Sequence, residues 1–323
     1  MSEYFLGIDI GGTKILTAIA DSSGKILISN KRSTEADKGQ DVIIDNIIKT
    51  IDNVLNNSNI SKEEVASIGI GSPGPLNTKD GVIIENANLP WRDVPIVELL
   101  EERTGISPIF LENDANAAAL GEKWFGAGRG VADLIYITIS TGIGGGIIID
   151  RRIYHGKSDI AGEVGHMIID PNGPLCGCGN HGCFEAMASG TAINRMAKKV
   201  VEDNQESKIF ALLKGDLNKI NGKVIAEAAE MGDQLAQDIW KRAAYYMGLG
   251  IANLLNIFNP GMIILGGGVM KAWDCFEKPM MESIKKHAFD SAFSSVEIKR
   301  SELGDDVGVK GAIAVAMGDR LLS

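Results

Sequence analysis

The first part of the chain alternates short apolar runs with polar turns that contain glycine. Three such runs, Tyr4–Ile10, Lys14–Ala20 and Ile26–Asn30, are separated by "GGT" and "DSSGK". Short apolar runs bounded by turn residues are typical of β-strands. The pattern therefore predicts three consecutive antiparallel strands joined by tight turns.

A helical periodicity replaces this pattern from Asp41 onward. Apolar side chains recur every three or four positions from Ile44 to Leu55, which predicts a helix with Asp41 as its cap. The runs "ASIGIG" and "SPIFLE" predict buried parallel strands, with a helix over Ile96–Thr104 between them that ends at Gly105. The order is thus three strands followed by alternating helix and strand.

The same order starts again at Asp133. "DLIYITIS", "TGIGG", "GIIID" and "RIYHG" repeat the opening of strands and turns, and helices over Thr191–Asp203 and Gln234–Phe258 precede a strand at "MIILGG". Two related halves predict two α/β domains that face a cleft. A helix over Val307–Leu321, amphipathic and rich in small residues, can return to pack on the first domain.

We therefore expect a small α/β domain formed by residues 1–114 plus 306–323. Residues 115–305 are expected to form a larger α/β domain that carries the cysteine-rich loop described below.

The composition fits a soluble globular protein. The chain has 323 residues, 45% of them hydrophobic, which is enough for a large core. It starts with "MSEYF", without the basic and apolar regions of a signal peptide, and no segment has the apolar length of a membrane span. We expect a cytoplasmic protein without membrane association. A net charge of −10 argues against nucleic acid as a bulk electrostatic partner.

Three glycine-rich turns each follow a predicted strand: "DIGGTK" at Asp9–Lys14, "STGIGGG" at Ser140–Gly146 and "LGGGV" at Leu265–Val269. None has the spacing of the P-loop or of the Rossmann fingerprint. Such glycines either shape a hairpin or let backbone N–H groups approach phosphate oxygens closely. Three of them in one chain favour phosphate binding, and Asp9, at a strand end, is suited to hold hydrated Mg²⁺.

The stretch "LENDANAAALGE", residues 111–122, has two compatible interpretations. Asp114 can cap a helix over Ala115–Lys123, because aspartate is a favoured capping residue. A carboxylate at the end of a buried strand can also accept the proton of a substrate hydroxyl that attacks a γ-phosphoryl group. Asn113 beside it can then fix the substrate by hydrogen bonds. The stretch alone leaves both interpretations open.

The segment "HMIIDPNGPLCGCGNHGCFE" holds three of the four cysteines. His166, Cys176, Cys178 and Cys183 have the spacing H-x9-C-x-C-x4-C, which is sufficient for a tetrahedral Zn²⁺ site. A full set leaves no open position for water, which predicts a structural rather than a catalytic zinc. The alternative is a group of buried, unrelated thiols, and the compact spacing favours the zinc site over it. His181 lies within the loop and is not counted as a ligand.

The other sulfur and imidazole groups lead to weaker expectations. Cys275 is expected to be a small core residue on a helix. His155 and His287 have no acid or thiol partner readable from their spacing, so we expect them to be structural or surface residues.

Seven motifs occur in an order that resembles the ROK family of sugar kinases and related repressors. They are "DIGGTK", "GSPGPL", "ENDANAAALGE", "STGIGGG", "GEVGHM", "CGCGNHGCFE" and "LGGGV", spread over about residues 5–320. The sequence is most similar to the ATP-dependent glucokinases of that family. The resemblance implies an actin-like, ribonuclease-H-like ATPase fold of two α/β domains. It also implies transfer of the γ-phosphoryl group of ATP to a hexose, with glucose converted to glucose 6-phosphate.

The resemblance also implies a role for each matching residue. Asp114 would be the general base, with ATP, Mg²⁺ and a structural Zn²⁺ as cofactors. The nucleotide would be bound by Asp9, Gly11, Gly12, Thr13, Lys14, Thr141, Gly142, Gly144, Gly145, Gly266, Gly267 and Gly268. The sugar would be bound by Gly74, Asn88, Asn113, Asp114, Glu163, His166 and Glu185. We expect a hexose and a nucleotide as partners, and a homodimer or homotetramer.

Several alternatives share these residues. Kinases of the family for fructose, mannose, N-acetylglucosamine or N-acetylmannosamine have most of them, so glucose rests on overall similarity. A sugar-responsive regulator would keep the pocket without turnover. Such regulators carry an N-terminal helix-turn-helix, for which "FLGIDIGGTK", beginning at residue 5, leaves no room. An actin-like filament or chaperone ATPase would explain the fold but not the zinc motif.

Overall fold

The protein is described by a computed structural model that covers residues 3–86 and 89–322. The chain forms two compact units. The first unit contains Met1–Tyr136, Gly146–Gly162 and Ser301–Ser323, and the second contains Ile137–Gly145 and Glu163–Arg300. The domain limits expected above, residues 1–114 plus 306–323 and residues 115–305, stay a prediction.

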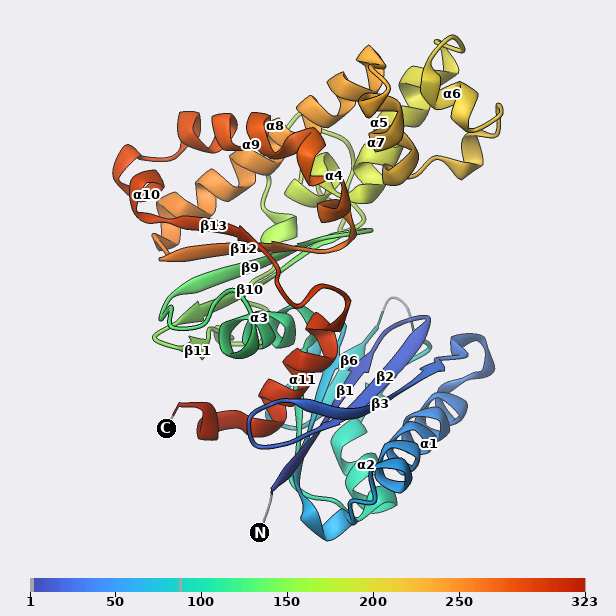
Figure 1. Ribbon diagram of the computed structural model, residues 1–323, viewed down its shortest axis with the longest axis vertical. Helices are drawn as coiled ribbons and strands as arrows, with labels where there is room; N and C mark the ends of the chain where they lie inside the picture. Colours follow the sequence, from blue (N-terminus) through green and yellow to red (C-terminus); the bar gives the residue numbers. More distant parts are fainter. Residues whose placement is uncertain (1–2, 87–88, 323) are drawn as a thin grey trace. The chain divides into compact units, whose positions relative to one another are not determined.

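A five-stranded sheet in the order β3-β2-β1-β4-β8 forms the centre of the first unit (Figure 1). Its strands are β1 (Tyr4–Ile10), β2 (Lys14–Ala20), β3 (Ile26–Ser33), β4 (Val65–Ser72) and β8 (Ile109–Asn113). Strands β1, β2 and β3 pair antiparallel, whereas β4 is parallel to both β1 and β8. The predicted antiparallel and parallel strand directions are confirmed, and β3 runs three residues past the predicted Asn30.

Strands β1, β2 and β4 are buried on both faces, which fits their nearly continuous apolar runs. The helices of the first unit are α1 (Gln40–Ser58), α2 (Ile96–Thr104), α3 (Asp114–Phe125) and α11 (Val307–Met317). Leu6 and Ile8 of β1 belong to the same core cluster as Ile43 of α1 and Leu100 of α2. Phe5 on the opposite face belongs to a cluster with α11. The last helix therefore packs on the first sheet, as predicted.

Helix ends follow local backbone geometry. Helix α2 ends at Gly105, whose φ is 71°, as the sequence predicts. Helix α1 begins at Gln40 with Gly39 as its N-cap, so the prediction of Asp41 as the cap is wrong. Asp41 lies instead in the first turn, where a carboxylate is still favourable to the helix dipole. The final helix is also shorter than predicted, because α11 ends at Met317 and a 3-10 helix follows.

A second five-stranded sheet has the order β11-β10-β9-β12-β13. Its strands are β9 (Leu134–Ile139), β10 (Ile143–Ile149), β11 (Arg152–Ile153), β12 (Met262–Gly266) and β13 (Glu297–Arg300). The division between the two compact units falls within β9 and β10. A small sheet of β5 (Leu76–Asn77), β6 (Val82–Glu85) and β7 (Arg92–Val94) was not predicted, because strands of two to four residues carry too little periodicity.

The second unit is rich in helices. They are α4 (Phe184–Ala188), α5 (Gly190–Glu202), α6 (Lys208–Leu212), α7 (Gly222–Glu230), α8 (Gln234–Phe258), α9 (Trp273–His287) and α10 (Asp290–Ser295). The 3-10 helices of the chain are η1 (Ala36–Lys38), η2 (Lys62–Glu64), η3 (Val164–His166), η4 (Leu217–Lys219), η5 (Gly268–Ala272), η6 (Gly304–Asp306) and η7 (Gly318–Leu321). Helix α8 has the predicted bounds. Over the residues that the structure describes, none of the helices has both the length and the apolarity to cross a membrane.

Candidate active site

The turn between β1 and β2 carries the first glycine motif. The Gly11 N–H donates a hydrogen bond to the Lys14 carbonyl over 2.9 Å, and the Thr34 hydroxyl donates to the Gly11 carbonyl over 2.7 Å. The Thr34 N–H also donates to the Thr13 carbonyl, over 3.1 Å. These bonds fix the backbone of the turn, while the Thr13 side chain remains exposed.

Asp9 lies at the end of β1, against the first turn of α11. A Cβ atom at Gly308 would come within 2.7 Å of the Asp9 carboxyl carbon, so a larger residue at 308 would force this carboxyl group to move. Burial raises the pKa of Asp9 to about 6, the nearby Lys14 ammonium opposes the increase, and the charge of Asp114 adds to it. A cation bound here would displace the proton and recover the cost of burying the carboxylate.

Strand β8 ends and α3 begins at the predicted Asn-Asp pair. The Asn113 Oδ1 accepts hydrogen bonds from the N–H groups of Ala115 and Asn116, at 2.9 and 3.2 Å. Asn113 is therefore the N-cap, and the interpretation of Asp114 as the cap is wrong. The cap falls on the residue that still has extended backbone, and Asn113 has φ −62° and ψ 144°. Asp114 is the first helical residue, and its Oδ1 accepts from the Ala115 N–H over 2.8 Å.

Gly74 lies beside Asn113 in the first unit. A Cβ atom at Gly74 would be 3.8 Å from Asn113 Nδ2, so the amide group faces the backbone of this loop. The first unit thus brings Gly74 next to Asn113, and Asp9 within electrostatic reach of Asp114. Asn88, also predicted to contact the sugar, lies outside the described residues.

The second glycine motif forms the turn between β9 and β10. The Ser140 N–H donates to the Gly142 carbonyl over 2.8 Å, and the Gly190 N–H, at the start of α5, donates to the Ser140 carbonyl over 2.7 Å. The hydroxyl of Thr191 donates to the Thr141 carbonyl over 2.8 Å. The N-terminus of α5 therefore supports this turn, and the predicted Gly144 and Gly145 follow it in the first half of β10.

The third glycine motif joins β12 to η5. Gly267 has φ 90°, and a Cβ atom there would be 2.3 Å from the Ile139 carbonyl oxygen, so the turn requires glycine. Thr141 from the second motif and Gly268 from the third line one pocket of about 730 Å³ in the second unit. Residues of α5, α7 and η5 line it as well. Two of the three predicted nucleotide motifs therefore meet at one cavity.

The four predicted zinc ligands lie together. One ligand atom from each of His166, Cys176, Cys178 and Cys183 is within 4.8 Å of the other three. Cys176 Sγ is 3.7 Å from His166 Nδ1, and the sulfurs of Cys178 and Cys183 are 3.6 Å apart. A tetrahedral zinc with Zn–S bonds of about 2.3 Å needs ligand separations of about 3.8 Å. The residues therefore fit a zinc ion.

The loop that carries these ligands has its own hydrogen bonds. The Cys176 N–H donates to the Asn180 carbonyl over 2.8 Å. The Asn180 N–H lowers the pKa of Cys178 to about 7, whereas burial raises that of Cys183 to about 12. Zinc binding must therefore release a tightly held proton from Cys183. His181 Nδ1 lies 3.0 Å from the Gly173 carbonyl oxygen, and His181 does not belong to the ligand cluster.

Glu163, His166 and Glu185 connect this cluster to its surroundings. While His166 Nδ1 faces the thiols, its Nε2 lies 3.8 Å from Glu163 Oε2. Glu185 Oε2 accepts a hydrogen bond from the Ile143 N–H over 2.9 Å, and its Oε1 lies 3.8 Å from Cys176 Sγ. Glu185 thus joins the cysteine cluster to the turn between β9 and β10. Sequence reasoning predicted only a sugar contact for this residue.

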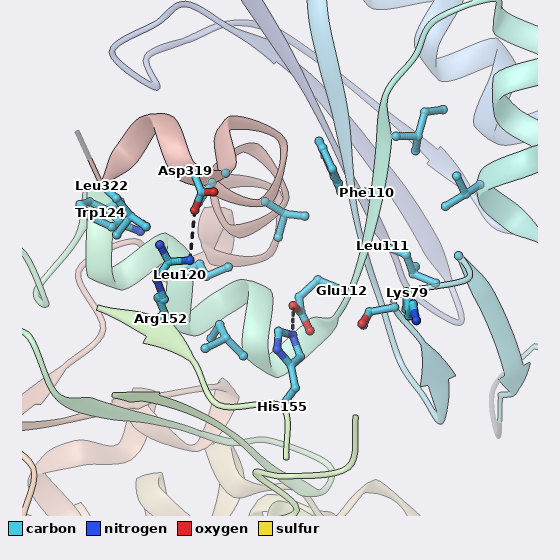
Figure 2. A pocket seen from close by; sticks show the side chains of 18 of the residues that line it. Lys79, Phe110, Leu111, Glu112, Leu120, Trp124, Arg152, His155, Asp319 and Leu322 are labelled. Carbon is cyan, nitrogen blue, oxygen red and sulfur yellow. Dashed lines mark hydrogen bonds and ion pairs between the residues drawn. The ribbon is translucent and has the colours of Figure 1, made fainter. Parts of the chain in front are cut away.

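One interaction next to the Asn113–Asp114 pair was not predicted from the sequence. His155 Nε2 lies 2.7 Å from Glu112 Oε2, on the lining of a pocket in the first unit (Figure 2). The spacing of His155 in the sequence had shown no acid partner. The partner is 43 positions away in sequence, and only the fold brings the two together.

Comparisons with known proteins agree over the whole chain. The sequence pattern of the ROK family matches residues 5–318. A glucokinase of Thermotoga maritima is 37% identical over 96% of both chains. A putative xylose repressor of a Caldicellulosiruptor species is 33% identical over 98% of this chain and 78% of its own length.

Comparison with a solved structure also shows similarity to the ROK family. The chain superposes with a TM-score of 0.81 on a ROK family glucokinase from Streptomyces griseus in complex with glucose and AMPPNP. The two are 36% identical, and the match covers 98% of this chain and 99% of the other. The predicted actin-like fold with two α/β domains is thereby confirmed. By sequence and by fold, the chain belongs to the ROK family.

Proposed function

We propose that this protein is a hexokinase-type kinase that phosphorylates glucose to glucose 6-phosphate with ATP. The observation that carries the proposal is the nearly full-length similarity to glucokinases, at 37% and 38% identity over 96% of the chain. The Asn-Asp pair at the end of β8 supplies the chemical group that this reaction requires, because a carboxylate there can accept the hydroxyl proton.

In this proposal Asp114 is the general base, and Asn113 binds the sugar through its Nδ2 group. The Oδ1 of Asn113 already accepts two hydrogen bonds from α3, which leaves the amide nitrogen to donate to a sugar hydroxyl. The helix therefore fixes the orientation of this amide. The other proposed sugar ligands are Gly74, Asn88, Glu163, His166 and Glu185.

The nucleotide is assigned to the glycine turns. The phosphates would be bound by Gly11, Gly12, Thr13, Lys14, Thr141, Gly142, Gly144 and Gly145, and the adenosine by Gly266, Gly267 and Gly268. Backbone N–H groups in such turns match phosphate oxygens. Asp9 would hold Mg²⁺, because its half-buried carboxylate gains a compensating charge from the cation. When bound, the ion neutralises charge on the transferred phosphoryl group.

A structural zinc is assigned to His166, Cys176, Cys178 and Cys183. If Nδ1 of His166 binds zinc, its Nε2 remains able to contact the sugar, which reconciles the two predicted roles of this side chain.

We also propose a cytoplasmic location, because ATP and free hexoses meet there. A homodimer or homotetramer is proposed as the oligomeric state, which light scattering after size exclusion measures.

A coupled assay with ATP and Mg²⁺ over a panel of hexoses tests the function. Glucose should give the highest kcat/KM among glucose, fructose, mannose, N-acetylglucosamine and N-acetylmannosamine. A higher value for another sugar would replace glucose as the substrate. Sugar binding without turnover of any hexose would refute the kinase and favour a regulator.

A further inference from the structure

Glu112 is a buried carboxylate directly before the proposed sugar-binding and catalytic residues. It is 6% exposed, and a buried charge is costly unless it is well bonded. Its Oε1 accepts hydrogen bonds from the Asn113 N–H over 2.9 Å and from Asn116 Nδ2 over 3.0 Å. Its Oε2 lies 2.7 Å from His155 Nε2. Both oxygens of the Glu112 carboxylate therefore have hydrogen-bond partners.

The partners of Glu112 lie on both sides of Asp114 in the chain. Asn113 is the last residue of β8, and Asn116 belongs to the first turn of α3. Through these two bonds, Glu112 holds the end of the strand to the start of the helix. The backbone that carries Asp114 is thus fixed from both sides. A displacement of about 1 Å at such a group can lower turnover by on the order of 10²-fold.

His155 holds the other oxygen of Glu112 from a separate segment. This segment follows β11 and is anchored in turn by Asp159, whose Oδ2 accepts bonds from the N–H and the hydroxyl of Thr78, both over 3.0 Å. The His155 side chain is 35% exposed and lines a pocket of about 700 Å³, where Figure 2 shows it pointing at Glu112. Protons in solution can therefore reach the imidazole.

The charges around His155 determine how it titrates. The hydrogen bond to Glu112 raises the pKa of His155, burial opposes the increase, and the charges of Glu112 and Asp159 add to it. The other charged groups that line the pocket are Lys79, Asp80, Arg151, Arg152 and Asp319. Arg152 and Asp319 pair with each other at 3.2 Å. A protonated imidazole makes a charge-assisted bond to Glu112, roughly twice as strong as the bond of the neutral ring.

We propose that Glu112 and His155 form a positioning pair for phosphoryl transfer. His155 holds the Glu112 carboxylate, and Glu112 fixes the backbone from which the Asn113 amide and the Asp114 carboxylate project. The inference rests on the proposed function and adds a residue pair to it. Neither side chain needs to touch the sugar or the nucleotide.

The kinetic test compares His155→Gln with the wild type over a range of pH. Glutamine can still donate to Glu112 but never carries a charge. At pH 6, kcat for glucose should fall on the order of 3- to 10-fold, the effect of about 1 kcal/mol in one hydrogen bond, with the KM for ATP unchanged within about twofold. The ratio of wild-type to variant kcat should approach one as the pH rises and the wild-type imidazole loses its proton. A merely structural role would give a ratio that does not depend on pH.

A second variant and a control complete the kinetic test. Glu112→Gln should lower kcat by a similar factor, and the double variant should lose less than the product of the two single effects. His287→Gln is the matched control, because the His287 ring also has a close hydrogen-bond partner, the Ser283 carbonyl oxygen 2.8 Å from its Nδ1, but lies in the second unit. Its kcat should equal that of the wild type at every pH. If Glu112→Gln does not fold, the pH dependence of His155→Gln decides.

A titration of the histidine ring signals by NMR gives a readout without turnover. His155 should titrate above the ordinary value of about 6.5, and Glu112→Gln should lower its pKa. With glucose turnover present in the wild type, a kcat ratio independent of pH overturns the inference alone. An unchanged His155 pKa in Glu112→Gln does the same. Absence of turnover of any hexose by the wild type overturns the proposed function and the inference with it.

Discussion

At the scale of single residues, the catalytic role proposed for Asp114 can be tested separately from its position at the start of α3. Because Asn113 provides the cap, Asp114→Asn keeps both bonds of the cap to α3. We expect kcat to fall on the order of 10²-fold or more through loss of the proton acceptor, with glucose affinity largely kept. A coupled assay and calorimetric titration with glucose measure the two effects.

Asp41→Asn is the matched control for this change. Asp41 also lies in the first turn of a helix, α1, but has no place in the proposed site. Its kcat should be unchanged, and both variants should lose less than about 1 kcal/mol of stability. Turnover of Asp114→Asn close to that of the wild type would show that Asp114 is not the general base.

At Asp9, we expect substitution to change stability and activity in opposite directions. Burial raises its pKa from 3.8 to about 6, so the folded state favours the neutral form. Its stabilising contribution is present below pH 3.8 and is lost as the pH rises through about 6. Above that pH, the ionised carboxylate costs up to about 3 kcal/mol, at about 1.4 kcal/mol for each unit of pKa.

Asp9→Asn should therefore raise the melting temperature at pH 7.5 without Mg²⁺ and abolish most turnover. Near pH 4 the two melting temperatures should converge. Thermal unfolding at both values of pH, beside the coupled assay, measures this. A lower melting temperature of the variant at pH 7.5 would show that Asp9 is not destabilising when ionised.

The residues that sequence could predict are those whose chemistry is local. The zinc ligands lie within eighteen positions, so their spacing alone predicts a cluster, and the structure brings them together. The sequence alone could not identify the N-cap of α3, because Asn113 and Asp114 are both good caps. The position at which β8 ends decides between them. The Glu112–His155 contact depends on tertiary structure, and no short-range pattern contains it.

At the scale of elements, the cysteine-rich loop and the turn between β9 and β10 are joined by Glu185. Cys178→Ala should release zinc and lower the melting temperature, because metal binding to a folded site stabilises it. It should weaken glucose binding on the order of tenfold through His166 and Glu185. ATP binding should also weaken, by a smaller factor, because Glu185 accepts a hydrogen bond from the Ile143 N–H beside the turn proposed to bind phosphate.

Cys275→Ala controls for the loss of a thiol, since Cys275 lies on α9 outside the cluster. Elemental analysis and titrations with glucose and with a non-hydrolysable ATP analogue compare the two variants. Zinc near one equivalent per chain in the wild type but not in Cys178→Ala is the expected result. Unaltered glucose affinity in a protein without metal would separate the cluster from the sugar site.

Elements were predictable in proportion to their length and periodicity. Helix α8 has 25 residues and the predicted bounds, and β1 and β2 were also placed correctly. The close approach of α11 to the first sheet depends on Gly69, where a Cβ atom would be 2.1 Å from the Ala312 carbonyl oxygen. The sequence shows a glycine there, but which helix approaches it follows only from the fold.

At the scale of the whole molecule, the proposed reaction draws on both compact units. Asn113 and Asp114 belong to the first unit, and Glu163 and Glu185 belong to the second. The similarity to glucokinases spans both units, since it covers 96% of this chain. The choice among hexoses was not predictable from sequence, because hydroxyl recognition depends on the positions of donors and acceptors rather than on their identity.

Phosphoryl transfer to a sugar rather than to water requires that these residues act on one substrate with water excluded. We therefore expect glucose to draw the two units together, which reduces the radius of gyration in solution. Small-angle scattering with saturating D-glucose, and with L-glucose as a control of equal size and composition, measures this change. D-glucose alone should reduce the radius, and Asp114→Asn should respond as the wild type does, because its sugar contacts persist. Saturation confirmed by calorimetry together with an unchanged radius would show that binding does not move the units. Protection of ATP from hydrolysis would then have to come from the local geometry around Asp114.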